Sequence, residues 1–238
     1  DLGYDIWLLN SRGNKYCKQH KKFNTDSFEF WQFSFEEMSK IDLNDSIEDI
    51  KNIRLKENKK KNDFIYFGHS QGTTIIFTAL AENYKYISDI KLFIALAPVA
   101  RLSYLSSTLL NIARKSGLYK IFENEHKYEI LPYDEKRGEF MSAVSEHFGS
   151  LANFGLQLIS DEKSNEANNI DSVSLYFTKF PAGASLKSSE HLAQIFQHRK
   201  FIKYDYDNEI TNVNCIEKEK SIHELKELFS CVSQQIQD

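Results

Sequence analysis

One stretch constrains the fold of this chain more than any other: DFIYFGHSQGTTIIFTAL, residues 63–80. A short apolar run is followed by a turn of the pattern Gly-X-Ser-X-Gly and then by an apolar run of helical length. The residues of that turn are Gly68, His69, Ser70, Gln71 and Gly72. A strand, a sharp turn and a helix in this order are typical of a nucleophile elbow, the turn that presents a reactive serine.

The chemistry expected of this turn follows from its backbone. Ser70 is the predicted nucleophile, held in a strained conformation, and the turn is expected to leave no room for side chains at Gly68 and Gly72. The helix that starts at Gln71 would direct its backbone N–H groups at the site, so the Gln71 N–H is a candidate oxyanion donor. His69 is expected to pack and hydrogen-bond rather than to transfer protons. The alternative is an ordinary glycine-flanked turn between a strand and a helix.

Apolar runs on both sides of this stretch indicate an α/β fold. Residues 5–9 (DIWLL) and 90–98 (IKLFIALAP) are apolar without alternation, as in strands buried on both faces. Between the first run and the elbow, Ser34 and Glu37 form a capping-box pair at the start of a helix. Isoleucines at every third residue from 47 to 53 indicate a helix face. The sequence therefore predicts a parallel sheet with helices on both faces.

The pattern changes after residue 100. Apolar residues recur at helical spacing over 102–112, and no strand of the buried type is expected before about residue 174. We expect an incomplete core over residues 1–100, a helical cap or lid insertion over 101–205, and a divergent, helical C-terminal tail over 206–238.

Composition excludes several classes of function. A net charge of -4 on 238 residues does not suggest a nucleic-acid partner, and no apolar run approaches the roughly 20 residues that cross a bilayer. The three cysteines form no CxxC pair, so neither a zinc site nor a disulfide framework is indicated. We expect no metal and no cofactor, because serine nucleophile chemistry needs neither. No targeting peptide is visible, and the compartment stays open.

Several motifs in the same order resemble the acid lipase family, of the gastric and lysosomal lipase type. GHSQGTT is preceded by NSRGN and EFWQFSFEEM and followed by ALAPVA, and later by FPAGAS, HLAQIFQ and KYDYDN. The resemblance covers roughly residues 2–208. It implies an α/β-hydrolase core with a helical cap, and cleavage of acylglycerols or steryl esters at a lipid–water interface through an acyl-enzyme on Ser70. Members of the family are mostly secreted or lysosomal, or otherwise membrane-associated. His191 lies in a cap motif, where a structural or pocket role is expected.

The chain departs from the family pattern at the acid and the base. The family places Asp and then His after the cap, which counted from Ser70 falls at or beyond the end of this chain. Its His-Gly oxyanion motif precedes the strand matched by residues 5–9. We therefore expect a partial sequence, a fragment that supplies the nucleophile without its partners.

A triad within the chain is the less favoured alternative. Asp205 or Asp207 followed by His223 has the right order, but residues 221–236 are predicted to form a capped helix. A serine without a base is a poor nucleophile, so we expect the 238-residue polypeptide to hydrolyse esters weakly or not at all. The other functions considered are a catalytically inactive lipid-binding or interaction module, and a short-chain esterase or thioesterase.

Overall fold

The computed structural model describes residues 3–58, 63–100, 127–147, 175, 178–179 and 181–206. The chain divides into two compact units: the first comprises residues 1–11, 33–103 and 191–238, and the second residues 12–32 and 104–190. The apolar stripe predicted over 102–112 and the tail beyond residue 206 lie outside the described residues. The division into a core, a cap and a tail stays a prediction.

The first unit contains the predicted nucleophile turn, residues 68–72. Its elements are α1 (Phe35–Glu37), the π-helix η2 (Met38–Leu43), α2 (Asn44–Lys56), β1 (Phe64–His69), α3 (Gln71–Ala81), the 3-10 helix η3 (Lys85–Asp89) and β2 (Ile90–Leu96). The helix α9 (Leu186–His198) begins in the second unit and ends in the first.

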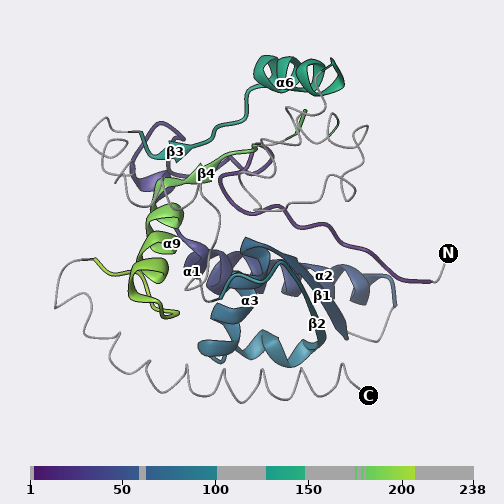
Figure 1. Cartoon of the computed structure of the whole chain (residues 1–238). Coiled ribbons are helices and arrows are strands. Elements are labelled where there is room, and N and C mark those ends of the chain that lie inside the picture. The colour runs from purple at the N-terminus through teal and green to yellow at the C-terminus, as the bar shows by residue number, and fades with distance from the viewer. Residues whose placement is uncertain are drawn as a thin grey trace. The chain divides into compact units, whose positions relative to one another are not determined.

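The two strands of the first unit form a parallel pair, as the sequence predicts. Ile65 lies opposite Leu92, and His69 lies opposite Leu96, so both strands end at the same edge. The connecting helix α3 packs against β1 (Figure 1). It covers the face that carries Phe93, whose ring meets that of Phe77 at a centroid distance of 5.4 Å.

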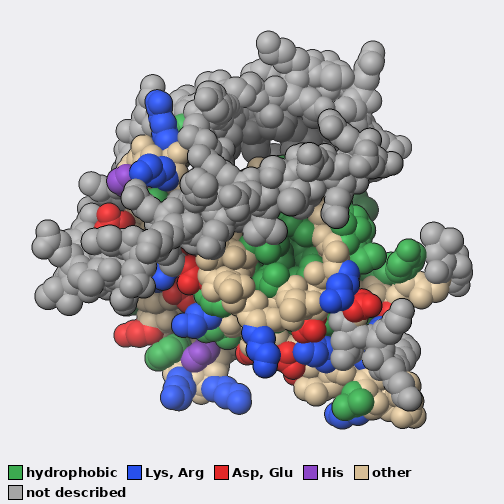
Figure 2. All heavy atoms as spheres, turned by 90° about the horizontal axis from the view of Figure 1, so that it is seen from below, with side chains coloured by type: hydrophobic (Ala, Val, Ile, Leu, Met, Phe, Trp, Pro, Cys, Tyr) green, Lys and Arg blue, Asp and Glu red, His purple; other side chains and the backbone are tan. Residues whose placement is uncertain are grey.

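The predicted burial of both sheet faces is wrong for the described part of the chain. Ile65, Phe67, Leu92 and Leu96 share the face opposite α3, and all four are exposed. Figure 2 shows hydrophobic side chains on the described surface, interspersed with charged ones. Among the described helices, α3 packs against β1, and a single helix can cover one face.

The strand predicted over residues 5–9 is also absent. This segment has no regular structure, and its side chains are exposed, Leu8 by 88%. A strand exists only with a hydrogen-bonded neighbour, and in the described part β1 and β2 pair only with each other. An ion pair between Asp5 and Arg54, at 3.0 Å, anchors the segment instead.

The capping box at the start of α1 is confirmed. The Ser34 hydroxyl accepts a hydrogen bond from the Glu36 N–H at 3.2 Å, and the Glu37 carboxylate accepts one from the Ser34 N–H at 2.7 Å. Further along, α2 buries Ile47 and Ile50 of the predicted isoleucine face, whereas Ile53 is 39% exposed, so the prediction is wrong for that residue. The other large apolar side chains buried in the first unit are Phe33, Phe35, Met38, Leu43, Ile75, Ile76, Phe77, Tyr86 and Ile195.

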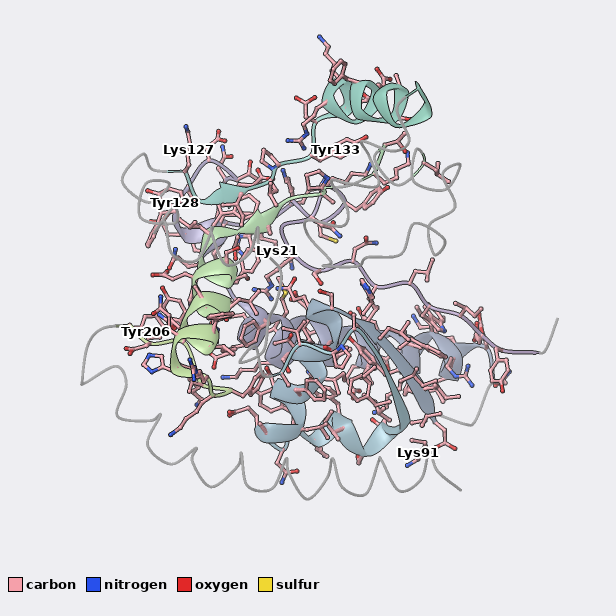
Figure 3. All side chains as sticks on the ribbon, in the orientation of Figure 1. Lys21, Lys91, Lys127, Tyr128, Tyr133 and Tyr206 are labelled. Atoms are coloured by element: carbon pink, nitrogen blue, oxygen red, sulfur yellow. The ribbon has the colours of Figure 1, made fainter. Side chains whose placement is uncertain are left out.

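The second unit holds a short antiparallel pair, β3 (Glu129–Ile130) and β4 (Ala184–Ser185), with η1 (Glu29–Trp31) and α6 (Glu135–His147). The strand β3 was not predicted, because two residues carry no periodic signal. Tyr128 and Tyr133 lie on the two sides of β3 (Figure 3), and the Tyr133 ring receives the Lys15 ammonium at 3.7 Å. Among the described residues, none of the helices has the length and apolarity that a bilayer crossing requires.

Replacing Ser34 by Ala should lower the free energy of unfolding by about 1–3 kcal/mol, because both the cap of α1 and a hydrogen bond of the buried His191 are lost. Urea unfolding measures the change. The control is Ser88→Ala, which removes an exposed hydroxyl bonded to the Lys85 carbonyl and should cost less than about 0.5 kcal/mol. Equal effects of the two substitutions would contradict the role given to Ser34.

Candidate nucleophile site

Ser70 has the strained backbone that the sequence predicts. It joins β1 to α3 with φ 49° and ψ -117°, a region that side chains other than glycine rarely occupy, at a cost of about 1–3 kcal/mol. Its side chain is exposed. Within the described part of the chain, the hydroxyl makes no hydrogen bond. The turn therefore presents a free serine hydroxyl at the carboxyl end of a parallel strand.

Three hydrogen bonds hold the strained residue. The Ser70 N–H donates to the Leu96 carbonyl at 3.0 Å. The Ser70 carbonyl accepts from the Thr73 N–H at 2.9 Å and from the Thr73 hydroxyl at 2.6 Å. Both backbone polar groups of the serine are thus fixed from outside, one by β2 and the other by α3.

The two glycines of the turn have different roles. A Cβ at Gly68 would lie 2.9 Å from the Gly72 carbonyl carbon and 3.0 Å from the Thr73 nitrogen, so it would collide with backbone. A Cβ at Gly72 would meet only the Tyr66 hydroxyl, at 3.7 Å, which is an ordinary contact. The prediction that neither position has room is correct for Gly68 and wrong for Gly72, because the crowding comes from α3 crossing over the end of β1.

Tyr66 lies beneath the turn. Its hydroxyl donates to the Gly72 carbonyl at 3.1 Å, and its ring lies 5.9 Å from that of Phe93. Burial raises the pKa of Tyr66 to about 12, so the phenol stays neutral and remains a donor at any physiological pH. The sequence does not predict this contact, because a tyrosine inside an apolar strand gives no separate signal.

The first turn of α3 contains the Gln71 N–H, which the sequence predicts to be an oxyanion donor. No side chain caps this helix, and in the part of the chain that the structure describes the Gln71 N–H donates to no acceptor. Unpaired N–H groups at a helix start carry partial positive charge. The arrangement can therefore stabilise negative charge that develops next to the serine hydroxyl. His69 is exposed at the end of β1.

His191 lies in a different environment. The ring is fully buried and stacks on Phe35 at a centroid distance of 4.0 Å. Its Nε2 lies 2.9 Å from the Ile202 carbonyl, which can only accept, so Nε2 is the donor, and Nδ1 faces the Ser34 hydroxyl at 3.2 Å. These contacts favour the structural role over the pocket role for His191.

Of the acid and base residues proposed from the sequence, the structure describes only Asp205. Asp205 pairs through its backbone with the Gln194 side chain, by two hydrogen bonds of 2.8 Å, while Asp207 and His223 lie outside the described residues. The described side chains also contain no cluster of three His, Cys, Asp or Glu that could hold a metal ion.

Sequence comparison relates the chain to named lipases. It is 36% identical over 217 residues to gastric triacylglycerol lipase of Homo sapiens, covering 89% of this chain and 52% of the relative. It is 33% identical over 215 residues to the Homo sapiens lysosomal acid lipase/cholesteryl ester hydrolase, with coverage of 89% and 52%. Lipase member J of Homo sapiens is 33% identical over 221 residues, with coverage of 90% and 57%. The chain spans about half the length of these curated relatives, and no family model matches it.

The two glycines provide a matched pair of substitutions. Gly68→Ala should lower the free energy of unfolding by about 1–3 kcal/mol, because the new methyl group collides with backbone that cannot retreat. Gly72→Ala should be neutral, or stabilising by up to about 1 kcal/mol, because alanine favours the helix and has room. Urea unfolding of both variants decides, and a Gly72→Ala cost equal to that of Gly68→Ala would contradict this packing.

The buried phenol predicts a pH dependence of stability. Because folding raises the pKa of Tyr66 from its ordinary value of about 10 to about 12, its contribution is complete below pH 10 and is lost as the pH rises toward 12. Over that window the free energy of unfolding should fall less steeply in Tyr66→Phe, by up to about 1.4 kcal/mol per pH unit. Urea unfolding of the two proteins at several pH values measures the difference. Parallel slopes for Tyr66→Phe and the parent would contradict the burial of this hydroxyl.

Proposed function

The chain is related to the acid lipases, and from this premise we propose that it carries the nucleophile region of a serine ester hydrolase acting on lipid esters. The observation that supports this most directly is Ser70, an exposed hydroxyl on a strained backbone at φ 49° and ψ -117°, directly before α3. In an ordinary strand-to-helix turn, nothing would offset the free-energy cost of this backbone strain at a non-glycine residue. A nucleophile elbow, in contrast, requires the strained conformation at its serine.

In the proposed reaction, the Ser70 oxygen attacks the ester carbonyl while a base takes its proton. The carbonyl oxygen becomes an oxyanion, which the Gln71 N–H stabilises together with a second donor. The tetrahedral intermediate expels the alcohol, which receives the proton, and leaves an acyl group on Ser70. Water, deprotonated by the same base, then attacks the acyl carbon and releases the fatty acid and the serine.

The proposed substrates are acylglycerols or steryl esters at a lipid–water interface. The support is the similarity to gastric triacylglycerol lipase and to lysosomal acid lipase/cholesteryl ester hydrolase, because the names of these relatives state the two activities. The proposal includes a cap over residues 101–205 that carries the acyl-chain pocket. An esterase of short acyl chains is the nearest alternative, and comparison of a long with a short acyl ester separates the two.

One observation favours a second function, that of a catalytically inactive lipid-binding or interaction module. In the part of the chain that the structure describes, the Ser70 hydroxyl has no histidine partner, and His191 is bonded to Ser34 and Ile202. Such a module would keep the elbow as a packing feature and bind lipid without turnover.

The test is hydrolysis of p-nitrophenyl oleate and p-nitrophenyl butyrate by the natural protein that contains this sequence and by the 238-residue polypeptide. In the natural protein, Ser70→Ala should lower kcat/KM for the oleate by about a thousandfold or more, because the attacking oxygen is lost. Ser88→Ala, which removes an exposed hydroxyl of η3, should leave the rate unchanged. The 238-residue polypeptide should hydrolyse either ester weakly or not at all.

The outcomes separate the alternatives. A natural protein that binds oleate esters without hydrolysing them would favour the inactive module, and a preference for butyrate would favour the short-chain esterase. Full activity of Ser70→Ala would remove Ser70 as nucleophile. Rapid, Ser70-dependent turnover by the 238-residue polypeptide would refute the expected inactivity and place the base within this chain.

A further inference from the structure

Two buried threonines of α3 hold the segment that follows β2. The Val99 N–H donates to the Thr73 hydroxyl at 2.8 Å, and the Thr74 hydroxyl donates to the Val99 carbonyl at 2.7 Å. Both threonines are 0% exposed. Consecutive side chains of one helix thus satisfy both backbone polar groups of a single residue in another segment.

The Thr73 hydroxyl also belongs to the nucleophile turn. A carbonyl can only accept, so the hydroxyl hydrogen points at the Ser70 carbonyl, 2.6 Å away, and its lone pair receives the Val99 N–H. The single hydrogen of this hydroxyl is therefore used in the bond to the Ser70 carbonyl, and the two hydrogen bonds together fix the orientation of the hydroxyl. One oxygen atom links the carbonyl of the proposed nucleophile to the chain beyond β2.

A second hydrogen bond also joins Ser70 to the segment that ends β2. The Ser70 N–H donates to the Leu96 carbonyl at 3.0 Å, at the last residue of β2. Between these two points the chain turns sharply, with Ala97 at φ 47° and with Pro98, which has no N–H to donate. Residues 96–99 therefore touch the turn at Leu96 and again at Val99, on both sides of this bend.

Two buried threonines inside a helix require a structural explanation. β-branched residues are weaker helix formers than leucine or alanine, and a buried hydroxyl costs free energy unless it is hydrogen-bonded. Thr78 shows the ordinary solution, because its hydroxyl donates to the Thr74 carbonyl one turn back in the same helix. Thr73 and Thr74 differ from Thr78 in that each reaches outside α3 to a second segment.

We propose that Thr73 is a positioning residue for Ser70, and that Thr73 and Thr74 together couple the conformation of residues 96–99 to that of the nucleophile. Holding the Ser70 carbonyl at 2.6 Å opposes relaxation of its strained φ and ψ. The catalytic consequence rests on the proposed function, while the coupling itself is a property of the fold. Displacement of residues 96–99 would release the serine carbonyl and lower the reactivity of its hydroxyl without removing any group that touches substrate.

The test compares four variants. Thr73→Val removes the hydroxyl at constant shape, Thr73→Ser keeps it, Thr74→Val releases only the Val99 carbonyl, and Thr78→Val is the matched control in the same helix. Amide hydrogen exchange in the 238-residue polypeptide reports on the coupling. Thr73→Val should accelerate exchange at the Val99 and Ser70 N–H groups by about tenfold or more, Thr73→Ser should restore the parent rates, and Thr78→Val should leave both rates near parent.

Kinetics of the natural protein provide the second readout. Thr73→Val should lower kcat for p-nitrophenyl oleate by about 10- to 100-fold with KM changed less than about twofold, because only the geometry of the reacting group changes. Thr73→Ser should recover most of the rate. Thr78→Val should keep kcat, even where its stability falls as far as that of Thr73→Val.

The two proposals fail in distinguishable ways. If the natural protein shows no Ser70-dependent hydrolysis, the proposed function fails, and amide exchange still decides the coupling. Unchanged exchange at Val99 in Thr73→Val, or equal acceleration in Thr78→Val, would overturn the coupling whatever the activity. If Thr73→Val does not fold, Thr74→Val decides in its place: faster exchange at the Val99 and Ser70 N–H groups supports the coupling, and parent-like exchange rejects it.

Discussion

A serine held at positive φ is the constraint on which the rest of the site depends. The backbone of Ser70 at φ 49° and ψ -117° is unfavourable in isolation, and it persists because surrounding hydrogen bonds oppose relaxation. Its N–H is bonded to the end of β2, and its carbonyl is bonded twice to Thr73. The close crossing of α3 over Gly68, where no Cβ fits, leaves the turn little room to change.

This arrangement explains why the polar groups near the turn are buried where they are. The hydroxyls of Tyr66, Thr73 and Thr74 each donate to a backbone carbonyl, at Gly72, Ser70 and Val99 respectively. A buried hydroxyl with a partner costs little, whereas its removal takes a hydrogen bond from that carbonyl. The turn is therefore supported by hydrogen bonds from these side chains, while the Ser70 side chain remains exposed.

Sequence reasoning succeeded where the signal is local. The capping box of Ser34 and Glu37 depends on residues three apart and is present as predicted. The order of β1, turn and α3 was predicted from residues 63–80 alone. The apolar run of a strand is shorter than that of a helix, so the two elements can be told apart. It failed for residues 5–9, because an apolar composition shows that a segment can be buried in a sheet but does not supply the neighbouring strand.

The sequence by itself determined the position of the strand, turn and helix around Ser70, the parallel relation of β1 and β2, and the capping box of α1, since each was predicted from short-range patterns of residue type. Only the tertiary structure decided that Gly68 needs its missing side chain while Gly72 does not, that His191 is bonded to Ser34, and that Thr73 links Ser70 to Val99. The physical reason is the separation along the chain over which each interaction acts. Capping and periodicity act over a few residues, whereas steric exclusion and hydrogen bonding between distant segments exist only once packing has brought their atoms to within about 3 Å.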